Sequence, residues 1–282
     1  MNYSNIKNYN QRQFNATMKR EGITVNDYYD SNKTYDVFFR RNKRGTAPQG
    51  KLRLYYAQQT PISIGTIFTV KDVPYLVISQ DGIESDIYYS SIAVKCDTSF
   101  NVYSSTEKKL VTVPCVVISD KYTLEHNSTV SIVSGSVTVY TGDNPYAKDM
   151  KINNKYYNFS AYYKVGNTFY NNGLAYVYMT REATPTESSS TYKLTYSGET
   201  SFDMADATTY QLSYTAIKNG VYVVPTLTYA SSDKTIATVD DTGLMTLLAC
   251  GNVTITATWT DGSRVTTCNT AITVTNSGVE SE

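Results

Sequence analysis

The chain has 282 residues, and its 25 lysines and arginines balance its 25 aspartates and glutamates, so the formal net charge is zero. A balanced chain has no global field that would steer it onto nucleic acid or an anionic membrane. Its 27 tyrosines, against 8 phenylalanines and 1 tryptophan, favour strands and surfaces that contact other proteins.

The first ninety-six residues predict mostly short strands. Residues 1–22 are polar with scattered apolar positions, which suits a short helix or a mobile arm ending at Gly22. Residues 23–60 predict a strand, a basic Gly/Pro loop and a second strand, because apolar side chains alternate on each side of the loop. Residues 61–96 contain four short strand-like runs separated by turn residues, and this spacing is typical of a small barrel or sandwich.

The rest of the chain is also β-rich. A second β region begins near residue 111 and repeats a loose theme of glycine turn and tyrosine-rich strand, which would fit a duplication. Residues 183–191 are rich in Pro, Ser and Thr and predict a linker. The expected division is therefore a mostly β body with a barrel-like or sandwich domain at 1–112 and a second β region at 113–182, the linker 183–191, a β-sandwich at 192–276 and a frayed tail at 277–282.

The four cysteines, Cys96, Cys115, Cys250 and Cys268, are widely spaced and form no CxxC motif, which argues against a zinc ribbon. A hairpin turning at Asp261-Gly262 would leave Cys250 and Cys268 several residues apart along the ladder, too far for a disulfide. We expect free, mostly buried thiols. No apolar run approaches about 20 residues and no signal peptide is evident, so we expect no membrane contact and synthesis in a cytosol.

The C-terminal module has a specific pattern. Val253, Ile255, Ala257 and Trp259 alternate with polar residues, which predicts a strand with one buried face. The runs SSDKTIATV (231–239), DDTGLMTL (240–247) and ACGNVTITAT (249–258) resemble the bacterial immunoglobulin-like domain of group 2. The resemblance covers residues 192–275 and implies a seven-stranded sandwich that serves as a spacer or adhesive module in adhesins and phage structural proteins.

The body has a more diffuse resemblance. Residues 35–180 resemble the neck or head-closure proteins of tailed phages, through the Gly65 strand start, the run PYLVIS (74–79), Tyr88-Tyr89 and Val94-Lys-Cys96, although Asp97 stands where that pattern has Asn. The resemblance implies a homo-oligomeric ring of about 6 or 12 copies that lies between portal or adaptor and tail and closes the DNA-filled head. The chain would then be assembled in the host bacterial cytoplasm and reside in the virion.

One dense basic cluster is the candidate contact site. We expect it either to touch packaged DNA without sequence specificity in the ring lumen or to dock on an acidic portal surface. The alternative is a solvated hairpin loop, and the cluster itself lacks interleaved stacking aromatics. Its members are Arg40, Arg41, Lys43, Arg44, Lys51 and Arg53.

No motif predicts catalysis, a metal or a cofactor. His126 is the only histidine and lies in a polar, turn-like stretch, where we expect an exposed loop residue. The acidic stretches DGIESD (81–86) and DDTG (240–243) lack the ligand ladder of a calcium loop. We therefore expect a non-enzymatic protein of the phage neck. Two alternatives are a tail-tube or terminator protein with an Ig-like decoration, and a cell-surface or carbohydrate-binding module that recognises a host glycan.

Overall fold

The computed structural model describes residues 3–40, 51–83, 86–118, 124–127, 130–133, 135–186 and 189–278. The described chain is mostly β, as the sequence predicts. It divides into two compact units. The first comprises residues 1–102 and 111–183, and the second comprises residues 103–110 and 184–282.

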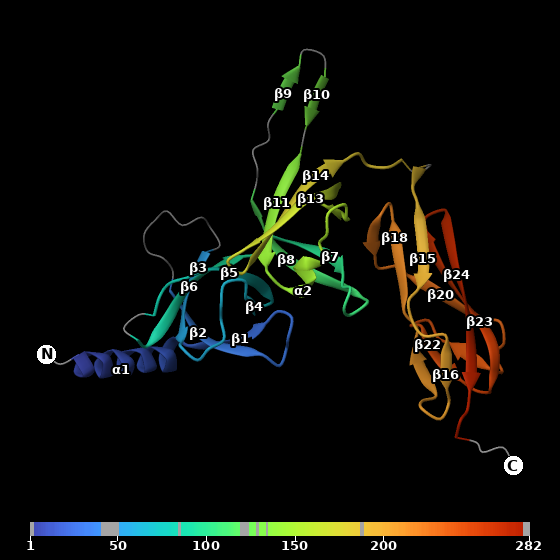
Figure 1. Ribbon diagram of the computed structural model, residues 1–282, viewed down its shortest axis with the longest axis horizontal. Coiled ribbons are helices and arrows are strands. Elements are labelled where there is room, and N and C mark those ends of the chain that lie inside the picture. The colour runs from blue at the N-terminus through green and yellow to red at the C-terminus, as the bar shows by residue number, and fades with distance from the viewer. Residues whose placement is uncertain are drawn as a thin grey trace. The chain divides into compact units, whose positions relative to one another are not determined.

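The first unit begins with helix α1 (Tyr3–Glu21), followed by a closed barrel (Figure 1). The helix confirms the helical alternative for the N-terminal segment, and it ends where the Gly22 N–H bonds to the Met18 carbonyl. In the order β1-β2-β3-β6-β5-β4, the barrel strands are β1 (Ile23–Asp27), β2 (Thr34–Arg40), β3 (Lys51–Ala57), β4 (Ile67–Val70), β5 (Val73–Gln80) and β6 (Tyr88–Lys95). Closure leaves the barrel without a free sheet edge.

The barrel interior is packed with apolar side chains around a small polar network. Tyr35, Val37, Leu54 and Tyr56 are buried there, which confirms the predicted alternation in β2 and β3. The Tyr56 hydroxyl lies 2.7 Å from Ser91 Oγ and accepts a bond from Gln80 Nε2 at 2.8 Å. These bonds satisfy the polar atoms that the strand positions bring inside.

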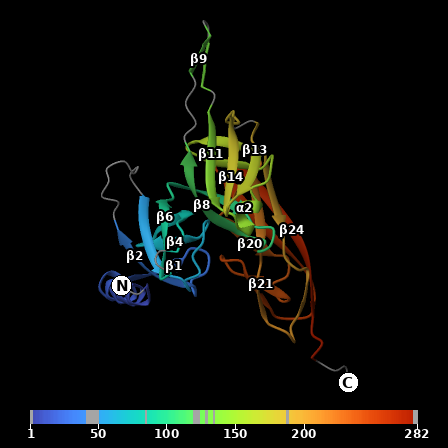
Figure 2. The ribbon, with the colours of Figure 1, turned by 60° about the vertical axis from the view of Figure 1, so that its left-hand side comes forward.

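A six-stranded sheet forms the rest of the first unit, in the order β12-β13-β14-β11-β8-β7. Figure 2 shows β8, β11, β14 and β13 in sequence across it. Helix α2 (Pro145–Lys148) lies between β11 and β12 in the chain. The strands are β7 (Thr98–Tyr103), β8 (Leu110–Ile118), β11 (Ser136–Gly142), β12 (Lys155–Asn158), β13 (Ala161–Asn171) and β14 (Leu174–Glu182).

The sheet corrects the expected division of the body. The predicted boundary at 112/113 falls inside β8, and the change from barrel to sheet comes between Lys95 and Thr98. No Gly/Pro-rich stretch marks this change, because β6 passes almost directly into β7. The pair β9 (Leu124–Asn127) and β10 (Val130–Val133) forms a separate two-stranded sheet.

Barrel and sheet share one apolar cluster, which joins Ile67 and Leu76 of the barrel to Val116 and Leu174 of the sheet, with Cys96 between them in the chain. Three glycines lie at the same junction. A Cβ at Gly142 would overlap the carbonyl oxygen of Gly65, and a Cβ at Gly65, whose φ is +90°, would overlap the carbonyl of Gly173. Backbone therefore packs directly against backbone where the two sheets meet.

The second unit is a β-sandwich between residues 192 and 275. A four-stranded sheet (β16-β24-β23-β20) accompanies two three-stranded sheets (β15-β18-β19 and β17-β22-β21). These ten strands exceed the seven expected, because several are only three residues long. The strands are β15 (Tyr192–Tyr196), β16 (Ser201–Asp203), β17 (Thr209–Gln211), β18 (Tyr214–Lys218), β19 (Val221–Val223), β20 (Leu227–Ser231), β21 (Ala237–Val239), β22 (Leu244–Leu247), β23 (Gly251–Asp261) and β24 (Arg264–Thr275).

Strand β23 confirms the predicted alternation. Val253, Ile255, Ala257 and Trp259 are buried, and the polar residues between them are half-buried or exposed. The hairpin register pairs Asp261 with Arg264 and Ala257 with Cys268, so Cys268 and Cys250 are separated along the ladder as expected. All four cysteines are free, but only Cys96 and Cys115 are buried, whereas Cys250 is exposed and Cys268 half-buried.

Candidate functional site

The predicted basic cluster lies where β2 ends and β3 begins. Arg40 is the last residue of β2 and pairs directly with Arg53 of β3. Both Arg40 and Lys51 are exposed. The other three members of the cluster, Arg41, Lys43 and Arg44, lie outside the described residues. The joint action of all six residues in one contact loop stays a prediction.

Arg53 is held within the unit. Its Nη1 donates to Asp81 Oδ2 at 2.6 Å and to Ser90 Oγ at 3.3 Å, and the Ser90 hydroxyl also donates to Asp81 at 2.8 Å. Arg53 and Arg40 face each other across the strand pair, and like charges in such positions destabilise a sheet. The Asp81 carboxylate neutralises the charge of Arg53. Arg53 is therefore a structural residue of the barrel wall.

Arg40 instead lies over aromatic rings. Its guanidinium carbon is 5.6 Å from the centre of the Phe38 ring and 5.8 Å from that of Tyr55. These two rings stack on each other with centroids 4.9 Å apart, and Tyr88 meets Tyr55 edge-on at 5.8 Å. A guanidinium over ring faces gains cation–π attraction without using its N–H donors.

Helix α1 completes this site through Phe14. The Phe14 ring stacks on Tyr88 with centroids 5.0 Å apart, and it is buried on the outer face of the barrel. Between helix and barrel lies a hollow of about 290 Å³, which we call the α1 hollow. It is lined by Asn10, Gln13, Phe14, Thr17, Phe38, Arg40, Tyr55 and Tyr88.

The α1 hollow was not predicted from the sequence. A usable signal exists in β2, where Phe38 interrupts the buried alternation of Tyr35 and Val37 with a second apolar face. A strand that is apolar on both faces is typically covered on both sides. That pattern could have indicated a cover over the outer face, but not that helix α1 supplies it.

A second surface that the sequence did not single out is the aromatic row of the six-stranded sheet. Phe169, Tyr176 and Tyr140 follow one another across β13, β14 and β11, with centroid separations of 4.5 Å and 5.8 Å. Phe169 is 51% exposed, and Tyr178 and Ile118 on the same face are also exposed. Such a surface offers contact area with few rotatable bonds to immobilise.

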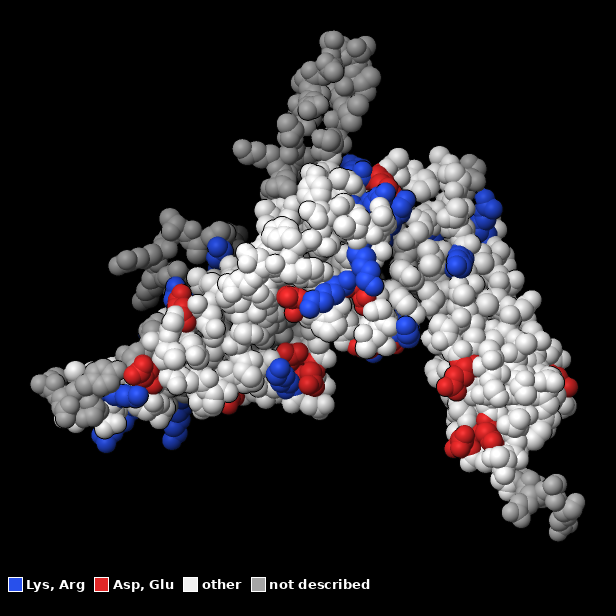
Figure 3. Space-filling view, viewed as in Figure 1, with Lys and Arg blue, Asp and Glu red and all other residues white. Residues whose placement is uncertain are grey.

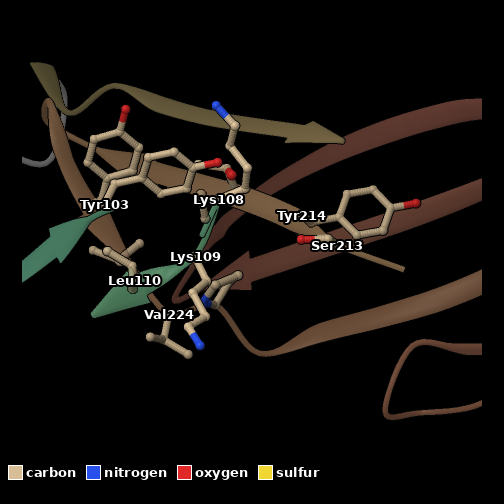
Figure 4. Close-up of a pocket in the computed structure, with 12 residues that line it drawn as sticks. Tyr103, Lys108, Lys109, Leu110, Ser213, Tyr214 and Val224 are labelled. Carbon is tan, nitrogen blue, oxygen red and sulfur yellow. The ribbon is translucent and has the colours of Figure 1, made fainter. Parts of the chain in front are cut away.

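A hollow of about 260 Å³ lies in the second unit (Figure 4). Tyr103 and Tyr222 stack beside it with centroids 4.8 Å apart. Two lysines line it, and Lys109 is paired with Glu107 at 2.7 Å. On the face shown in Figure 3, charged side chains lie in small groups, some of one sign and some of both, separated by uncharged surface.

Where the structure describes them, the remaining candidate residues have local partners. His126 lies in β9, paired in register with Ser131, so the predicted turn at this position is wrong. Asp81 pairs with Arg53, Asp86 lies 3.7 Å from Lys7, and the Asp240 carboxylate accepts bonds from its own turn. Across the described residues, no group of three or more His, Cys, Asp or Glu side chains could hold a metal ion.

The buried thiols are also unsuited to nucleophilic chemistry. Burial raises the pKa of Cys96 to about 12, and it raises the pKa of the fully buried Cys115 well above its ordinary value. Because the thiolate is the nucleophile, both groups remain protonated and inert near neutral pH.

Two families match parts of the chain. Residues 204–270 match the bacterial Ig-like domain (group 2). Residues 90–180 match the YomX C-terminal domain, a phage-associated family. No curated protein is significantly similar to the chain.

The Ig-like match falls within the sandwich of the second unit and confirms the fold expected there. The match to the YomX C-terminal domain begins in β6 and ends in β14, so it spans the last barrel strand and the six-stranded sheet. Together the two matches support a phage-related protein, and both are non-catalytic kinds of domain. In the part of the chain that the structure describes, no helix has the length and apolar character needed to span a bilayer.

Proposed function

We propose that this chain is a structural protein of the phage neck. Copies form a ring between the portal or adaptor and the tail, close the DNA-filled head and dock the tail, and each carries an Ig-like domain as a decoration. The observation that carries the proposal is the match of residues 90–180, the centre of the body, to a phage-associated domain. The Ig-like domain adds to it, since it is a binding or spacer module rather than a catalytic one.

The architecture of the first unit fits this role. A closed barrel has no free edge, and a junction of backbone against backbone keeps barrel and sheet in one orientation, which a ring under load from packaged DNA requires. The aromatic row and the α1 hollow give two separate surfaces on this unit. Ring closure by rotation uses two different faces of each subunit, because heterologous contacts are not self-complementary.

The experiment that tests the proposal is cryo-electron microscopy of the phage particle, with the copy number determined by quantitative mass spectrometry. We expect density for this chain at the head–tail junction and about 6 or 12 copies per particle. Tens to hundreds of copies along the tail would contradict the neck role and support the tail-tube alternative. A single copy, or a monomer that binds host cell walls without the particle, would refute the ring.

A further inference from the structure

The α1 hollow is lined by an arginine for which the described residues of the first unit provide no carboxylate. Arg40 and Arg53 are direct cross-strand neighbours, and of the two only Arg53 has a carboxylate partner within the described part of the chain. Among the described residues, the ion pairs do not include Arg40, and the lining of the hollow contains no aspartate or glutamate. The exposed guanidinium gains attraction from the rings, and its N–H donors stay available to water or to a partner.

The surroundings of Arg40 restrict the chemistry of that partner. The guanidinium of Arg40 lies over the Phe38 and Tyr55 rings, and contact with the rings restricts the positions from which its N–H donors can reach a partner. A carboxylate accepts two parallel N–H bonds from the edge of a guanidinium, and this geometry is stronger and more specific than a contact to a point charge. The rings of Phe14 and Tyr88 and the amides of Asn10 and Gln13 form walls for the methylene groups behind a carboxylate.

A duplex would use this site poorly. Phosphates lie on the outside of a wide cylinder with one charge per about 1.7 Å of axis, so a duplex binds several basic groups spread over an extended surface and not one arginine beside a small hollow. A side chain that projects from a protein surface can enter a hollow of about 290 Å³. The small size of the hollow and its single arginine therefore favour a protein side chain over packaged DNA.

We propose that the α1 hollow receives a glutamate or aspartate side chain from a neighbouring protein chain, with Arg40 as the residue that binds its carboxylate. The inference rests on the proposed function only for the origin of the neighbour, which is then a protein of the particle. The chemistry rests on the hollow itself. The proposal assigns Arg40 to protein docking. Arg53 has a different role, because it is bound to Asp81 in the barrel wall.

The first test uses the isolated full-length protein and a fluorescein-labelled oligoglutamate peptide, measured by anisotropy at low salt. We expect Arg40→Gln to weaken peptide binding about tenfold or more, because a charge-assisted bond is lost. Lys51→Gln is the matched control, since it removes one exposed positive charge from the adjacent strand without altering the lining of the hollow. Its effect should stay below about threefold.

Several results would overturn the inference. If both variants weaken peptide binding equally, the peptide is attracted by non-specific positive charge and not by the hollow. If the wild-type protein does not bind the peptide, the hollow is not a carboxylate site. A labelled DNA duplex, measured in parallel, tests whether Arg40 binds phosphates of nucleic acid instead of a protein carboxylate. If Arg40→Gln lowers affinity for DNA but not for the peptide, Arg40 contacts nucleic acid instead. Unchanged thermal unfolding of both variants would show that the fold is intact.

The second test places the contact in the particle. Arg40→Lys introduces an amine that carbodiimide can couple to a carboxylate within reach, whereas the wild-type arginine does not react in this way. We expect mass spectrometry to find a cross-link from position 40 to an aspartate or glutamate of another chain. If native lysines of the chain cross-link but position 40 does not, in particles that hold the chain at the neck, the inference fails while the proposed function stands. If the chain is absent from the neck, the proposed function fails and the peptide measurement still decides the chemistry of the hollow.

Discussion

The two units of this chain achieve close packing in opposite ways. In the first, barrel and sheet meet where Gly65, Gly142 and Gly173 leave no room for a Cβ, so the fit depends on the absence of side chains at the end of β11 and in two turns. In the second, the core depends on apolar side chains at every other position of β23. A junction of backbones tolerates no added atom, whereas a side-chain core loses stability gradually as atoms are removed.

The largest effect that this difference predicts comes from Gly142→Ala. The new Cβ would overlap the Gly65 carbonyl oxygen, and neither backbone can move away by a change of rotamer. We expect the first unit to lose about 4 kcal/mol of unfolding free energy. Hydrogen exchange followed by mass spectrometry measures this loss separately in peptides from each unit.

The matched control is Gly135→Ala, where a Cβ would lie 3.5 Å from the Arg181 side chain, an ordinary contact. Its exchange should match the wild-type protein. The second unit contains the only tryptophan, Trp259, whose fluorescence should be unaffected by Gly142→Ala. Equal losses in both units would mean that they unfold together, and the contrast between them would then be invalid.

The second prediction concerns the side-chain core. Ile255 is fully buried in β23, and Ile255→Ala should cost the second unit about 3 kcal/mol through lost burial and a residual cavity. Denaturant titration followed by Trp259 fluorescence measures this cost directly. Val265→Ala on the adjacent strand, where the side chain is 63% exposed, should change the midpoint by less than about 0.5 kcal/mol. A small loss from Ile255→Ala would show that the sandwich collapses around the site.

The same difference explains how much of the structure could be predicted. The alternation in β23 and the turn at Asp261-Gly262 are local signals, and they predicted the buried face and nearly the correct register. The glycine junction forms only when the fold brings two turns and the end of β11 together, so the sequence alone does not indicate it. The predicted boundary of the body fell inside β8 because no linker in the sequence marks the true change. Strands β6 and β7 belong to different sheets but follow each other almost directly in the chain.

The candidate site was predicted only in part. The run of basic residues predicted a contact loop, and within it the structure describes Arg40 and Lys51 as exposed, while their contact role stays a prediction. It could not indicate that Arg53 has a partner 28 residues away in the chain, because ion-pair partners depend on strand order. Nor could it indicate that Phe14 brings α1 onto the outer face of β2 and β6.

A smaller effect tests the polar part of the barrel. The buried Tyr35 donates its hydroxyl hydrogen to Asp27 Oδ2 at 2.6 Å, and burial is the main cause of its raised pKa. Tyr35→Phe keeps the ring and removes this charge-assisted bond, so we expect a loss of about 1.5 kcal/mol from the first unit. Tyr157→Phe, where the side chain is 56% exposed, is the control and should leave hydrogen exchange unchanged. If the two variants behave alike, solvent replaces the Tyr35 hydroxyl as the donor to Asp27.

The smallest effect distinguishes the second unit by its response to acid. Hydrogen bonds lower the pKa of Asp203, Asp233 and Asp240 below 3.8, and the Lys218 ammonium lowers that of Asp261. A carboxyl group whose pKa is lower in the folded state stabilises the fold above the unfolded pKa, and this contribution is lost as pH falls through the folded pKa. The Trp259-monitored midpoint should therefore stay constant from pH 7 to about pH 4 and decline below it.

Asp240→Asn tests the cause of this decline, because an amide oxygen can accept the turn's hydrogen bonds from Thr242 and Leu244 but does not titrate. The decline of the midpoint below about pH 4 should be shallower in this variant than in the wild-type protein. Asp241→Asn changes the same charge at the next residue, which is exposed, and should leave the slope as it is. Equal slopes in all three proteins would mean that the turn at Asp240 does not couple protonation to folding, and that the acid response arises from the Lys218–Asp261 pair or the other two carboxylates.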